Sequence, residues 1–254
     1  MVPDAALRVV RTARNTAQKQ ATASVLLARS RAFRKQMRVV PRDDLIRLGS
    51  AGYGFWVVPG RLLGERSVCY LGGVGEDITF DLGLIARFGC PVHAFDPVPR
   101  SQAFALAAAA HEPRFHFHPY GLWSSDTTLA FHSPSHEGYI SHSATNIHAT
   151  GVAFDAQVRS VQSLMAELGH DHVDLLKVSA EGSEYEILRG LLADGVRPGV
   201  IAVEYAQPAP AGQGAASTAS LEHAGYDLVD ASVSPWNWKL TFVHRDAASR
   251  RAGA

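Results

Sequence analysis

Beyond the first quarter of the chain, short apolar runs alternate with amphipathic stretches, and glycines stand where one kind of run gives way to the next. SVCYL (67–71) predicts a buried strand, GGVGED (72–77) a turn, and ITFDLGLIARFG (78–89) an amphipathic helix that Gly89 ends. PVHAF (91–95) predicts the next strand. Strands that alternate with helices in this way predict a parallel sheet with helices on both faces.

The same alternation continues to the C-terminus. No long helix separates the last two predicted strands, so we expect them to pair antiparallel. Five parallel strands closed by such a pair is the arrangement of class I methyltransferases, a Rossmann-like α/β fold. The further elements are helices over 100–111, 163–168, 183–192 and 218–224, strands over 114–122, 173–178, 199–205, 226–231 and 239–244, an inserted hairpin and polar loop over 127–151, and a flexible segment over 206–217.

The N-terminal part of the chain has a different pattern. Residues 5–38 are rich in Ala, Arg, Gln and Leu and contain no Gly or Pro, which predicts a long helix. A short helix is expected over 43–48, and the aromatic, Gly-rich stretch 51–64 predicts a hairpin or ordered loop over the mouth of the main domain. We therefore divide the chain into a basic helical extension (1–50) and a class I methyltransferase domain (51–254).

Charge is distributed unevenly along a chain whose net charge is zero. Residues 1–43 hold ten Lys and Arg against two Asp, which leaves +8 there and −8 on the rest. A basic arm can bind nucleic acid or an anionic membrane. We favour the alternative of a helical extension packed on its own acidic domain or on a second subunit, as in a homodimer. Phe33 is the only aromatic residue among these charges, which argues against a nucleic-acid partner.

Composition adds three limits. With 254 residues, 46 % of them hydrophobic, the chain can bury a full core without disulfides or metals. Its two cysteines, Cys69 and Cys90, stand in strand-like apolar surroundings, which predicts buried free thiols and a reducing, cytoplasmic compartment. No apolar run approaches the ~20 residues of a membrane-spanning helix.

The predicted turn after the first strand has the composition of a ligand site. Gly72, Gly73 and Gly75 follow the strand directly, at the sheet edge where ligands of open α/β folds bind. Asp96, followed by Pro97, ends the second strand 21 residues after Gly75. An acid at that place typically accepts hydrogen bonds from the ribose hydroxyls of an adenosine cofactor. The alternative is a turn or helix cap that Pro97 stabilises.

The choice of cofactor rests on the incomplete glycine pattern. GGVGED lacks the full G-x-G-x-x-G, so S-adenosylmethionine, whose short amino-acid tail tolerates a looser turn, is favoured over a nicotinamide dinucleotide. A nicotinamide oxidoreductase stays the competing interpretation. Glu76 or Asp77 is expected to receive the methionine amino group or to complement the dipole of the following helix. The adenine is expected near the third strand, over Gly121, Leu122 and Trp123, although Trp123 also fits the core.

Three stretches resemble the FkbM-type methyltransferases, and the closing strand pair is similar to theirs. They are LGGVGEDITFD (71–81), RFGCPVHAFDPVPRS (87–101) and VDLLKVSAEGSEYEIL (173–188), of which EGSEYEIL is the most specific. The resemblance covers more than half of the chain. It implies S-adenosylmethionine-dependent O-methylation, usually of a hydroxyl on a sugar or natural product, and hence a small-molecule acceptor.

The chain departs from the family's pattern at three carboxylates. Tyr70 and Leu71 stand where the family generally has an Asp near the end of the first strand, Ser179 replaces the Asp of Lys-x-Asp, and Gln162 replaces the Asp of a Leu-Asp pair. Ser179 stays a candidate cofactor contact through hydrogen bonding, but it supplies no charge. A degenerate, non-catalytic cofactor-binding or interaction module is therefore the second hypothesis.

Methyl transfer to a hydroxyl requires a positioned nucleophile and a general base. Glu181, which follows the fourth strand, is our first candidate, and its alternative is an acid near a helix start. His142 is the second, because ISHSATN resembles the family's Ser-rich substrate-side stretch and a histidine suits this role. His116 and His118 share one strand face, but two residues do not make a metal site, so we expect no metal.

Overall fold

The computed structural model describes residues 22–52, 54–135, 138–147 and 149–248. Its centre is a seven-stranded sheet in the order β11-β12-β10-β9-β3-β4-β5. These strands are β3 (Cys69–Gly72), β4 (Val92–Phe95), β5 (Phe115–His118), β9 (Leu175–Val178), β10 (Val200–Ala206), β11 (Tyr226–Val233) and β12 (Asn237–His244).

The strand directions confirm the predicted fold class. Strands β10, β9, β3, β4 and β5 run parallel, and β12 lies antiparallel between β10 and β11. The last two strands therefore pair antiparallel as predicted, and the final strand enters the sheet beside β10. Five parallel strands with a last strand inserted in the opposite direction form the sheet of the class I methyltransferases.

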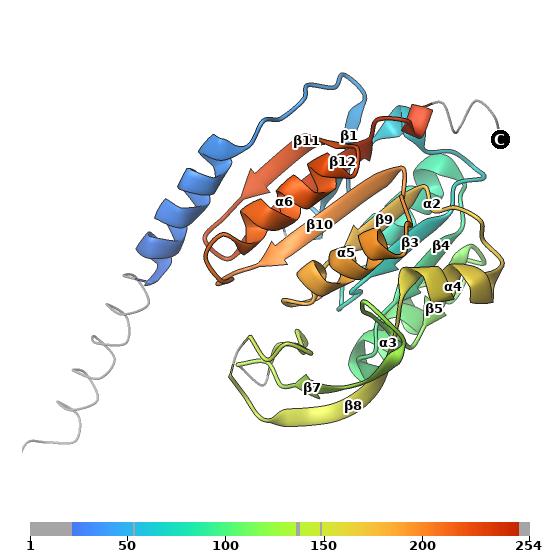
Figure 1. Cartoon of the computed structure of the whole chain (residues 1–254). Coiled ribbons are helices and arrows are strands. Elements are labelled where there is room, and N and C mark those ends of the chain that lie inside the picture. Colours follow the sequence, from blue (N-terminus) through green and yellow to red (C-terminus); the bar gives the residue numbers. More distant parts are fainter. Residues whose placement is uncertain (1–21, 53, 136–137, 148, 249–254) are drawn as a thin grey trace, which may run out of the picture.

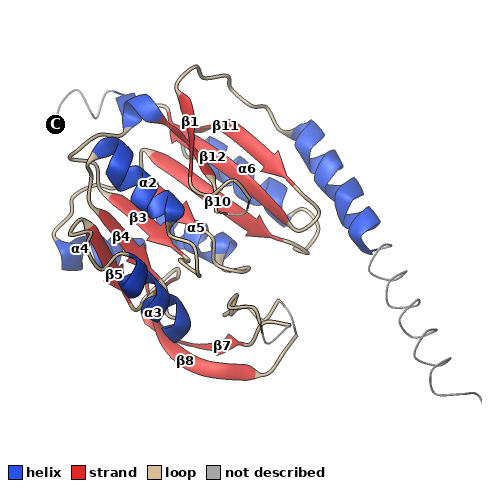
Figure 2. Cartoon of the chain, turned by 180° about the vertical axis from the view of Figure 1, so that it is seen from behind, coloured by secondary structure: helices blue, strands red, loops and turns tan. Residues whose placement is uncertain are grey.

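Helices cover both faces of this sheet, as the alternating pattern predicts. One face carries α2 (Thr79–Phe88) and α3 (Pro99–Ala108), seen in Figure 2, and the other carries α4 (Val161–Leu168), α5 (Glu184–Ala193) and α6 (Gln213–His223), seen in Figure 1. Successive side chains of a strand point to opposite faces. Cys69 and Leu71 therefore pack with α2, whereas Tyr70 packs with the core under α4 and α5.

The two cysteines meet on the α2 side of the sheet. Cys69 and Cys90 are fully buried, and their Sγ atoms lie 3.8 Å apart without a disulfide bond. The prediction of two buried free thiols is confirmed. The compartment stays a prediction. Within the part of the chain that the structure describes, no helix combines the length and the apolarity that crossing a membrane requires.

Residues 43–48 contain a strand, so the predicted short helix is wrong. β1 (Leu45–Leu48) pairs antiparallel with β2 (Trp56–Pro59), and a 3-10 turn over Gly60–Leu62 follows. The Asp44 carboxylate, which could have capped a helix, instead accepts two 2.8 Å hydrogen bonds from the Arg42 guanidinium. The hairpin expected near 51–64 is present, and it spans residue 50. The division of the chain at that residue stays a prediction.

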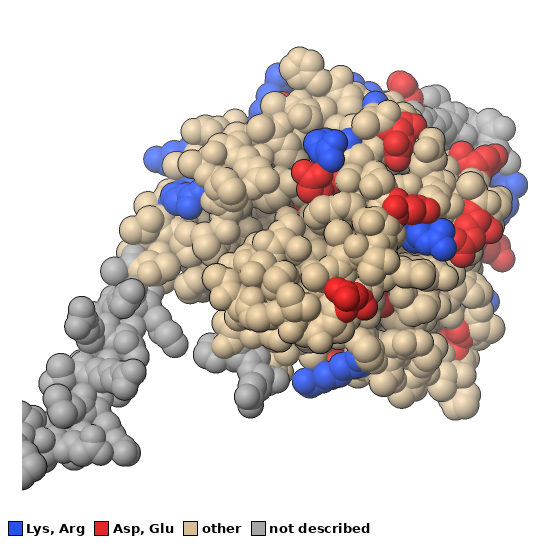
Figure 3. Space-filling view, turned by 60° about the horizontal axis from the view of Figure 1, so that its bottom comes forward, with Lys and Arg blue, Asp and Glu red and all other residues tan. Residues whose placement is uncertain are grey.

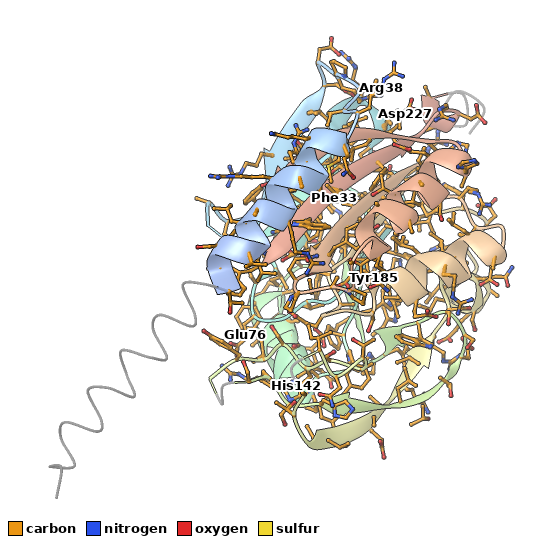
Figure 4. The ribbon with its side chains drawn as sticks, turned by 60° about the vertical axis from the view of Figure 1, so that its left-hand side comes forward. Phe33, Arg38, Glu76, His142, Tyr185 and Asp227 are labelled. Atoms are coloured by element: carbon orange, nitrogen blue, oxygen red, sulfur yellow. The ribbon has the colours of Figure 1, made fainter. Side chains whose placement is uncertain are left out.

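The N-terminal extension is helical over residues 22–36 and lies beside β11 and β12 (Figures 1 and 4). Phe33 stacks on Trp238 of β12 with ring centroids 4.1 Å apart, and the Trp238 indole donates a 2.8 Å hydrogen bond to the Ser30 hydroxyl. The helix therefore docks on its own domain, which was one of the expected arrangements. Residues 5–21 of the predicted helix lie outside the described residues. A homodimer and the absence of a nucleic-acid partner stay predictions.

The segment expected to be flexible before residue 218 is partly helical, because α6 begins at Gln213. The small residues of this helix allow close packing: a Cβ on Gly214 would lie 2.6 Å from the Trp238 ring and 3.5 Å from Phe33. The Ala and Gly residues, from which we predicted flexibility, thus allow this segment to pack closely on the N-terminal helix and β12. Only the packed structure supplies that contact, so the local pattern missed it.

A second, smaller sheet extends from the end of β5. It has the order β6-β8-β7, formed by Gly121–Leu122, Val152–Arg159 and Thr127–His132, respectively. The hairpin predicted over 127–151 therefore begins as expected, but its second strand, β8, lies beyond these bounds and was not predicted. The polar segment between β7 and β8 turns back onto the hairpin, where His132 and Ser143 exchange backbone hydrogen bonds of 2.9 and 3.1 Å.

Four histidines cluster on the face of β4 and β5 that lies opposite α2 and α3. The ring of His93 lies 4.9 Å from the rings of His116 and His170, and its Nδ1 lies 3.1 Å from Nε2 of His118. His170 is also hydrogen-bonded to the Tyr70 hydroxyl at 2.7 Å. Burial, with a smaller contribution from the neighbouring imidazoles, lowers the pKa of His93 to about 3.

This burial predicts a stability loss in acid. Between the ordinary pKa of 6.5 and the folded-state value of about 3, only the unfolded chain takes up the proton. The stability contributed by neutral His93 is therefore complete above the ordinary pKa of 6.5, and it is lost as the pH falls toward the folded-state pKa of about 3. We expect His93→Phe to lose less unfolding free energy than the wild type between about pH 7 and pH 4 in urea denaturation.

The control is His111→Phe at an exposed position, which should keep the wild-type pH dependence. An unchanged pH dependence in His93→Phe would contradict the assignment.

Candidate functional site

A cavity of about 490 Å³ lies at the carboxyl ends of β3, β4 and β9, beneath residues 138–142 of the segment between β7 and β8. Its volume is in the range of sites for small molecules and cofactors. Figure 3 shows the end of the molecule that carries β7 and β8, where the visible charged side chains are scattered among neutral ones. Twelve of the thirteen predicted site residues line the cavity: Gly72, Gly73, Gly75, Glu76, Asp77, Asp96, Pro97, Gly121, Leu122, His142, Ser179 and Glu181.

The glycine turn comes into direct contact with the end of β9. Gly73 has a φ of +80°, and a Cβ added there would overlap the carbonyl oxygen of Ser179. The Ser179 amide donates a 3.0 Å hydrogen bond to the Gly72 carbonyl across the same contact. Glycine is therefore required for the close packing of this turn on β9, and the packed turn forms part of the cavity wall.

Asp96 holds this turn from the neighbouring strand. One carboxylate oxygen accepts hydrogen bonds from the Val74 and Gly75 amides at 2.8 and 3.0 Å, and the other accepts from the Val98 amide at 2.9 Å. The side chain also lines the cavity and is 5 % exposed. Of the two alternatives, the turn is thus present in the structure, whereas α3 has no side-chain cap. Because a carboxylate has about four acceptor positions, the ribose role stays a prediction beside it.

The two acids after the turn have partners within the protein. Glu76 forms a bidentate ion pair with Arg100 at 2.6 and 2.8 Å on the surface. Asp77 accepts a 2.7 Å hydrogen bond from the Ser50 hydroxyl and one of 2.9 Å from the Thr79 amide at the start of α2. Both acids border the cavity, and their predicted contact with an amino group stays a prediction.

The expected adenine side is formed by the beginning of the small sheet. Gly121 and Leu122 line the cavity together with Phe131. Trp123 is the exception among the predicted residues, because it does not line the cavity, and its amide donates a 2.9 Å hydrogen bond to the Arg159 carbonyl. Side chains alternate along a strand, so the residue after Leu122 points elsewhere.

Glu181 lies in a tight turn between β9 and α5. Its φ of +45° is unusual for a residue with a side chain. The buried Glu184 stabilises this turn, since its carboxylate accepts hydrogen bonds from the Ala180 and Gly182 amides at 2.9 and 3.0 Å. Burial raises the pKa of Glu184 to about 8. Glu184 therefore holds the turn that presents Glu181 to the cavity.

His142 reaches the cavity from the inserted segment. Its neighbour Ser143 donates a 2.7 Å hydrogen bond to the Glu181 carbonyl, which ties the segment to the turn after β9. The Nδ1 atom of His142 lies 2.9 Å from the Ile140 carbonyl. Figure 4 shows His142 and Glu76 at the same end of the molecule. The structure thus brings the two predicted candidate bases to one cavity, and their roles stay predictions.

Four charged residues that the sequence analysis did not select also line the cavity, namely Asp81, Lys177, Glu204 and Lys239. Each is at most 9 % exposed. Glu204 accepts a 2.7 Å hydrogen bond from the Asn237 amide group and lies 3.4 Å from the Lys239 ammonium. One signal was available in the sequence: charged residues stand inside apolar strand runs such as VDLLKV and GVIAVEY. Buried charges are rare unless they are paired or functional.

The N-terminal hairpin covers these charges. The Trp56 ring of β2 lies 5.3 Å from the Lys177 ammonium and 4.8 Å from the Lys239 ammonium. The Lys239 ammonium also donates a 3.2 Å hydrogen bond to the Phe55 carbonyl. The expectation that residues 51–64 cover the mouth of the domain is therefore fulfilled by Trp56. Across the described ranges, no three His, Cys, Asp or Glu side chains are placed to hold a metal ion.

Residues 76–228 match the family described as "Methyltransferase FkbM domain". This match covers more than half of the chain and includes both the first helix after the glycine turn and the EGSEYEIL segment. No curated protein matches the sequence.

Several solved structures are similar to the chain at low identity. A fibrillarin from Aeropyrum pernix in complex with natively bound S-adenosyl-L-methionine has 9 % identity and a TM-score of 0.44, with 72 % of this chain and 68 % of that chain covered. A precorrin-6y C5,15-methyltransferase from Geobacter metallireducens has 10 % identity and a TM-score of 0.43, with 71 % of this chain and 82 % of that chain covered. A methyltransferase from Pyrococcus furiosus has 14 % identity and a TM-score of 0.39, with 89 % and 98 % covered.

The Gly73 contact predicts a large effect from a single methyl group. Gly73→Ala must accommodate both a positive φ and an overlap with Ser179, whereas Gly212→Ala has the same φ of +80° with open space around the added Cβ. We expect Gly212→Ala to lower the unfolding free energy by about 1 kcal/mol, and Gly73→Ala by clearly more, since overpacking adds about 1–3 kcal/mol. Urea denaturation measures both. Equal losses would contradict the close contact between the turn and β9.

Proposed function

The chain belongs to the FkbM methyltransferase family, and on that premise we propose that it transfers the methyl group of S-adenosylmethionine to a hydroxyl of a sugar or natural-product-like small molecule. One observation carries the proposal. The residues expected on the cofactor side, around Gly73 and Asp96, and those expected on the acceptor side, Glu181 and His142, border one cavity. Family membership also favours methyl transfer over the hydride transfer of a nicotinamide enzyme.

The residues around the cavity fit this cofactor in two respects. The glycine turn around Gly73 lines the cavity with backbone, and the buried carboxylate oxygen Oδ1 of Asp81 has no hydrogen-bond partner among the described residues. Both features are what a site for a ligand with polar donors requires. When bound, S-adenosylmethionine supplies an electrophilic methyl group on a sulfonium.

The chain's own residues would position the acceptor and remove its proton. The segment that carries His142 covers the cavity and is tied to the Glu181 turn through the Ser143 hydroxyl. A carboxylate or a neutral imidazole at this place can accept the proton of an acceptor hydroxyl as the oxygen forms its new bond to carbon. Closure by Trp56 on one side and the segment on the other would exclude water from the reacting atoms.

A non-catalytic binding protein is the second candidate, and one observation favours it. Ser179 stands at the end of β9 without the negative charge of an Asp, and its hydroxyl lies 3.5 Å from the Glu204 carboxylate. This arrangement keeps a polar contact while it removes one charge from the expected reaction centre.

Calorimetry with S-adenosylmethionine and a screen of hydroxylated acceptors for formation of S-adenosylhomocysteine test the proposal together. We expect binding, and turnover with at least one sugar or natural-product-like acceptor. Glu181→Gln or His142→Gln should then lower kcat by about 10²–10⁴-fold, depending on which of them is the general base. Glu186→Gln, which changes a half-buried acid on α5 that is paired with Arg189 and lies outside the cavity lining, is the matched control and should keep kcat.

Binding without consumption of the cofactor across the screen would leave the non-catalytic interpretation standing. Thermal stabilisation by NAD but not by S-adenosylmethionine would favour the oxidoreductase.

The ribose assignment has its own test. Asp96→Ala is expected to weaken binding of S-adenosylhomocysteine by about 1–3 kcal/mol, the scale of a lost hydrogen bond to a charged group. Because Asp96 also holds the glycine turn, the 2′,3′-dideoxy analogue serves as the control ligand. It should bind the variant and the wild type equally if the loss comes from the ribose hydroxyls. A parallel loss for both ligands would assign Asp96 to the turn alone.

A further inference from the structure

We propose that Asp81 and Lys177 together bind the zwitterionic amino-acid end of the cofactor, with Asp81 accepting from the ammonium and Lys177 donating to the carboxylate. This inference rests on the proposed function, because it assumes an S-adenosylmethionine site in the cavity. It assigns the amino-acid end to a pair of residues instead of Glu76 or Asp77, which border the same cavity.

Asp81 is a buried residue that lines the cavity, and its Oδ1 atom has no hydrogen-bond partner among the described residues. It lies in the first turn of α2, is 4 % exposed, and lines the cavity. No described residue donates a hydrogen bond to its Oδ1 atom. An unsatisfied buried carboxylate is strongly unfavourable, so its retention at a cavity wall indicates a donor that arrives with a ligand. Burial also raises its pKa to about 6, which is the behaviour of a carboxyl group that lacks such a donor.

Lys177 supplies the opposite charge at the same cavity. Its ammonium donates a 3.3 Å hydrogen bond to the Gly72 carbonyl and a shorter one to the Gly73 carbonyl. An ammonium has three N–H donors, so this arrangement keeps one for a further acceptor. The attraction between Lys177 and Asp81 offsets part of the burial that each charge experiences. A buried anion and a buried cation that line one cavity are complementary to an α-amino acid, which carries one group of each sign.

The positions of the two side chains along the sheet match this assignment. Asp96 and Gly121 lie at the ends of β4 and β5, on one side of β3. Lys177 belongs to β9, on the other side of β3, and Asp81 interacts with it electrostatically. A ligand whose adenosine occupies the β4–β5 side therefore extends its tail across the glycine turn toward Lys177 and Asp81.

The other acids near the turn are occupied. The Glu76 carboxylate is engaged on both oxygens by Arg100, and both oxygens of Asp77 accept hydrogen bonds from Ser50 and Thr79. These contacts lie within the protein and do not require a ligand. Asp81 differs from both acids because its buried Oδ1 atom accepts no hydrogen bond from a described residue.

Strand β3 itself offers no carboxylate for this purpose. The Tyr70 side chain points into the opposite core and bonds His170, and Leu71 is buried with α2. Asp81, from the helix that follows the turn, thus places a negative charge next to the end of a strand that lacks one.

Calorimetry on the full-length protein with two probes tests the pair. S-adenosylhomocysteine carries the amino-acid end, and 5′-methylthioadenosine shares its thioadenosine part without that end. We expect Asp81→Asn to weaken S-adenosylhomocysteine by about 10- to 100-fold and to leave 5′-methylthioadenosine within about twofold of the wild type. Glu186→Gln, which changes an acid on α5 paired with Arg189, is the matched control, and both probes should keep their wild-type affinities there. Glu76→Gln tests the competing assignment.

A second measurement keeps the test valid if Asp81→Asn folds poorly. On the wild-type protein, S-adenosylhomocysteine should bind at least about tenfold more tightly than its deaminated analogue. Equal affinities would overturn the assignment. It would also be overturned if Asp81→Asn weakened both probes alike, or if only Glu76→Gln lost affinity for S-adenosylhomocysteine. Absence of binding of either probe to the wild type would instead refute the proposed function.

Discussion

The site depends on one close backbone approach, that of the turn after β3 to the end of β9. Gly73 lies against the Ser179 carbonyl, where no side chain fits, and the Gly72 carbonyl accepts from the Ser179 amide. The approach leaves amides and carbonyls of the turn without the partners of a regular strand. Asp96 accepts from the amides and Lys177 donates to the carbonyls, so the turn is held by one charge of each sign. Buried backbone groups need such partners.

This arrangement determines where a ligand in the cavity would meet charged side chains. The two cationic side chains at the cavity, Lys177 and Lys239, lie beside the acids Asp81 and Glu204, and Trp56 packs over both ammonium groups. The cavity is also lined by Glu76, Asp77, Asp96 and Glu181, so acidic side chains outnumber the two lysines there. Methyl transfer from a sulfonium needs positioning and exclusion of water more than a strong field. A covered cavity suits that chemistry.

Segments far from the glycine turn in sequence complete the cavity. The β1–β2 hairpin contributes Trp56, and the segment between β7 and β8 contributes His142 and is bonded to the Glu181 turn through Ser143. The N-terminal helix does not reach the cavity-lining set, but it packs on β12 through Phe33 and Trp238. Since β12 also carries Lys239, the docked helix supports one wall of the site from behind.

The sequence by itself determined the α/β fold, because the hydrophobic periods of helices and strands depend on neighbouring residues. The order of strand, turn and helix also located Gly73, Asp96 and Glu181. The sequence did not reveal that residues 43–48 pair as a strand, that α6 begins at Gln213, or that Trp123 points away from the cavity. Nor did it distinguish Asp81 from Glu76 and Asp77, three acids in six consecutive positions. Only the tertiary structure decided these points. The start of α6 and the roles of the three acids depend on partners that are distant in sequence: Trp238 packs against Gly214, Arg100 pairs with Glu76, and Lys177 interacts electrostatically with Asp81. Local periodicity carries no information about such partners.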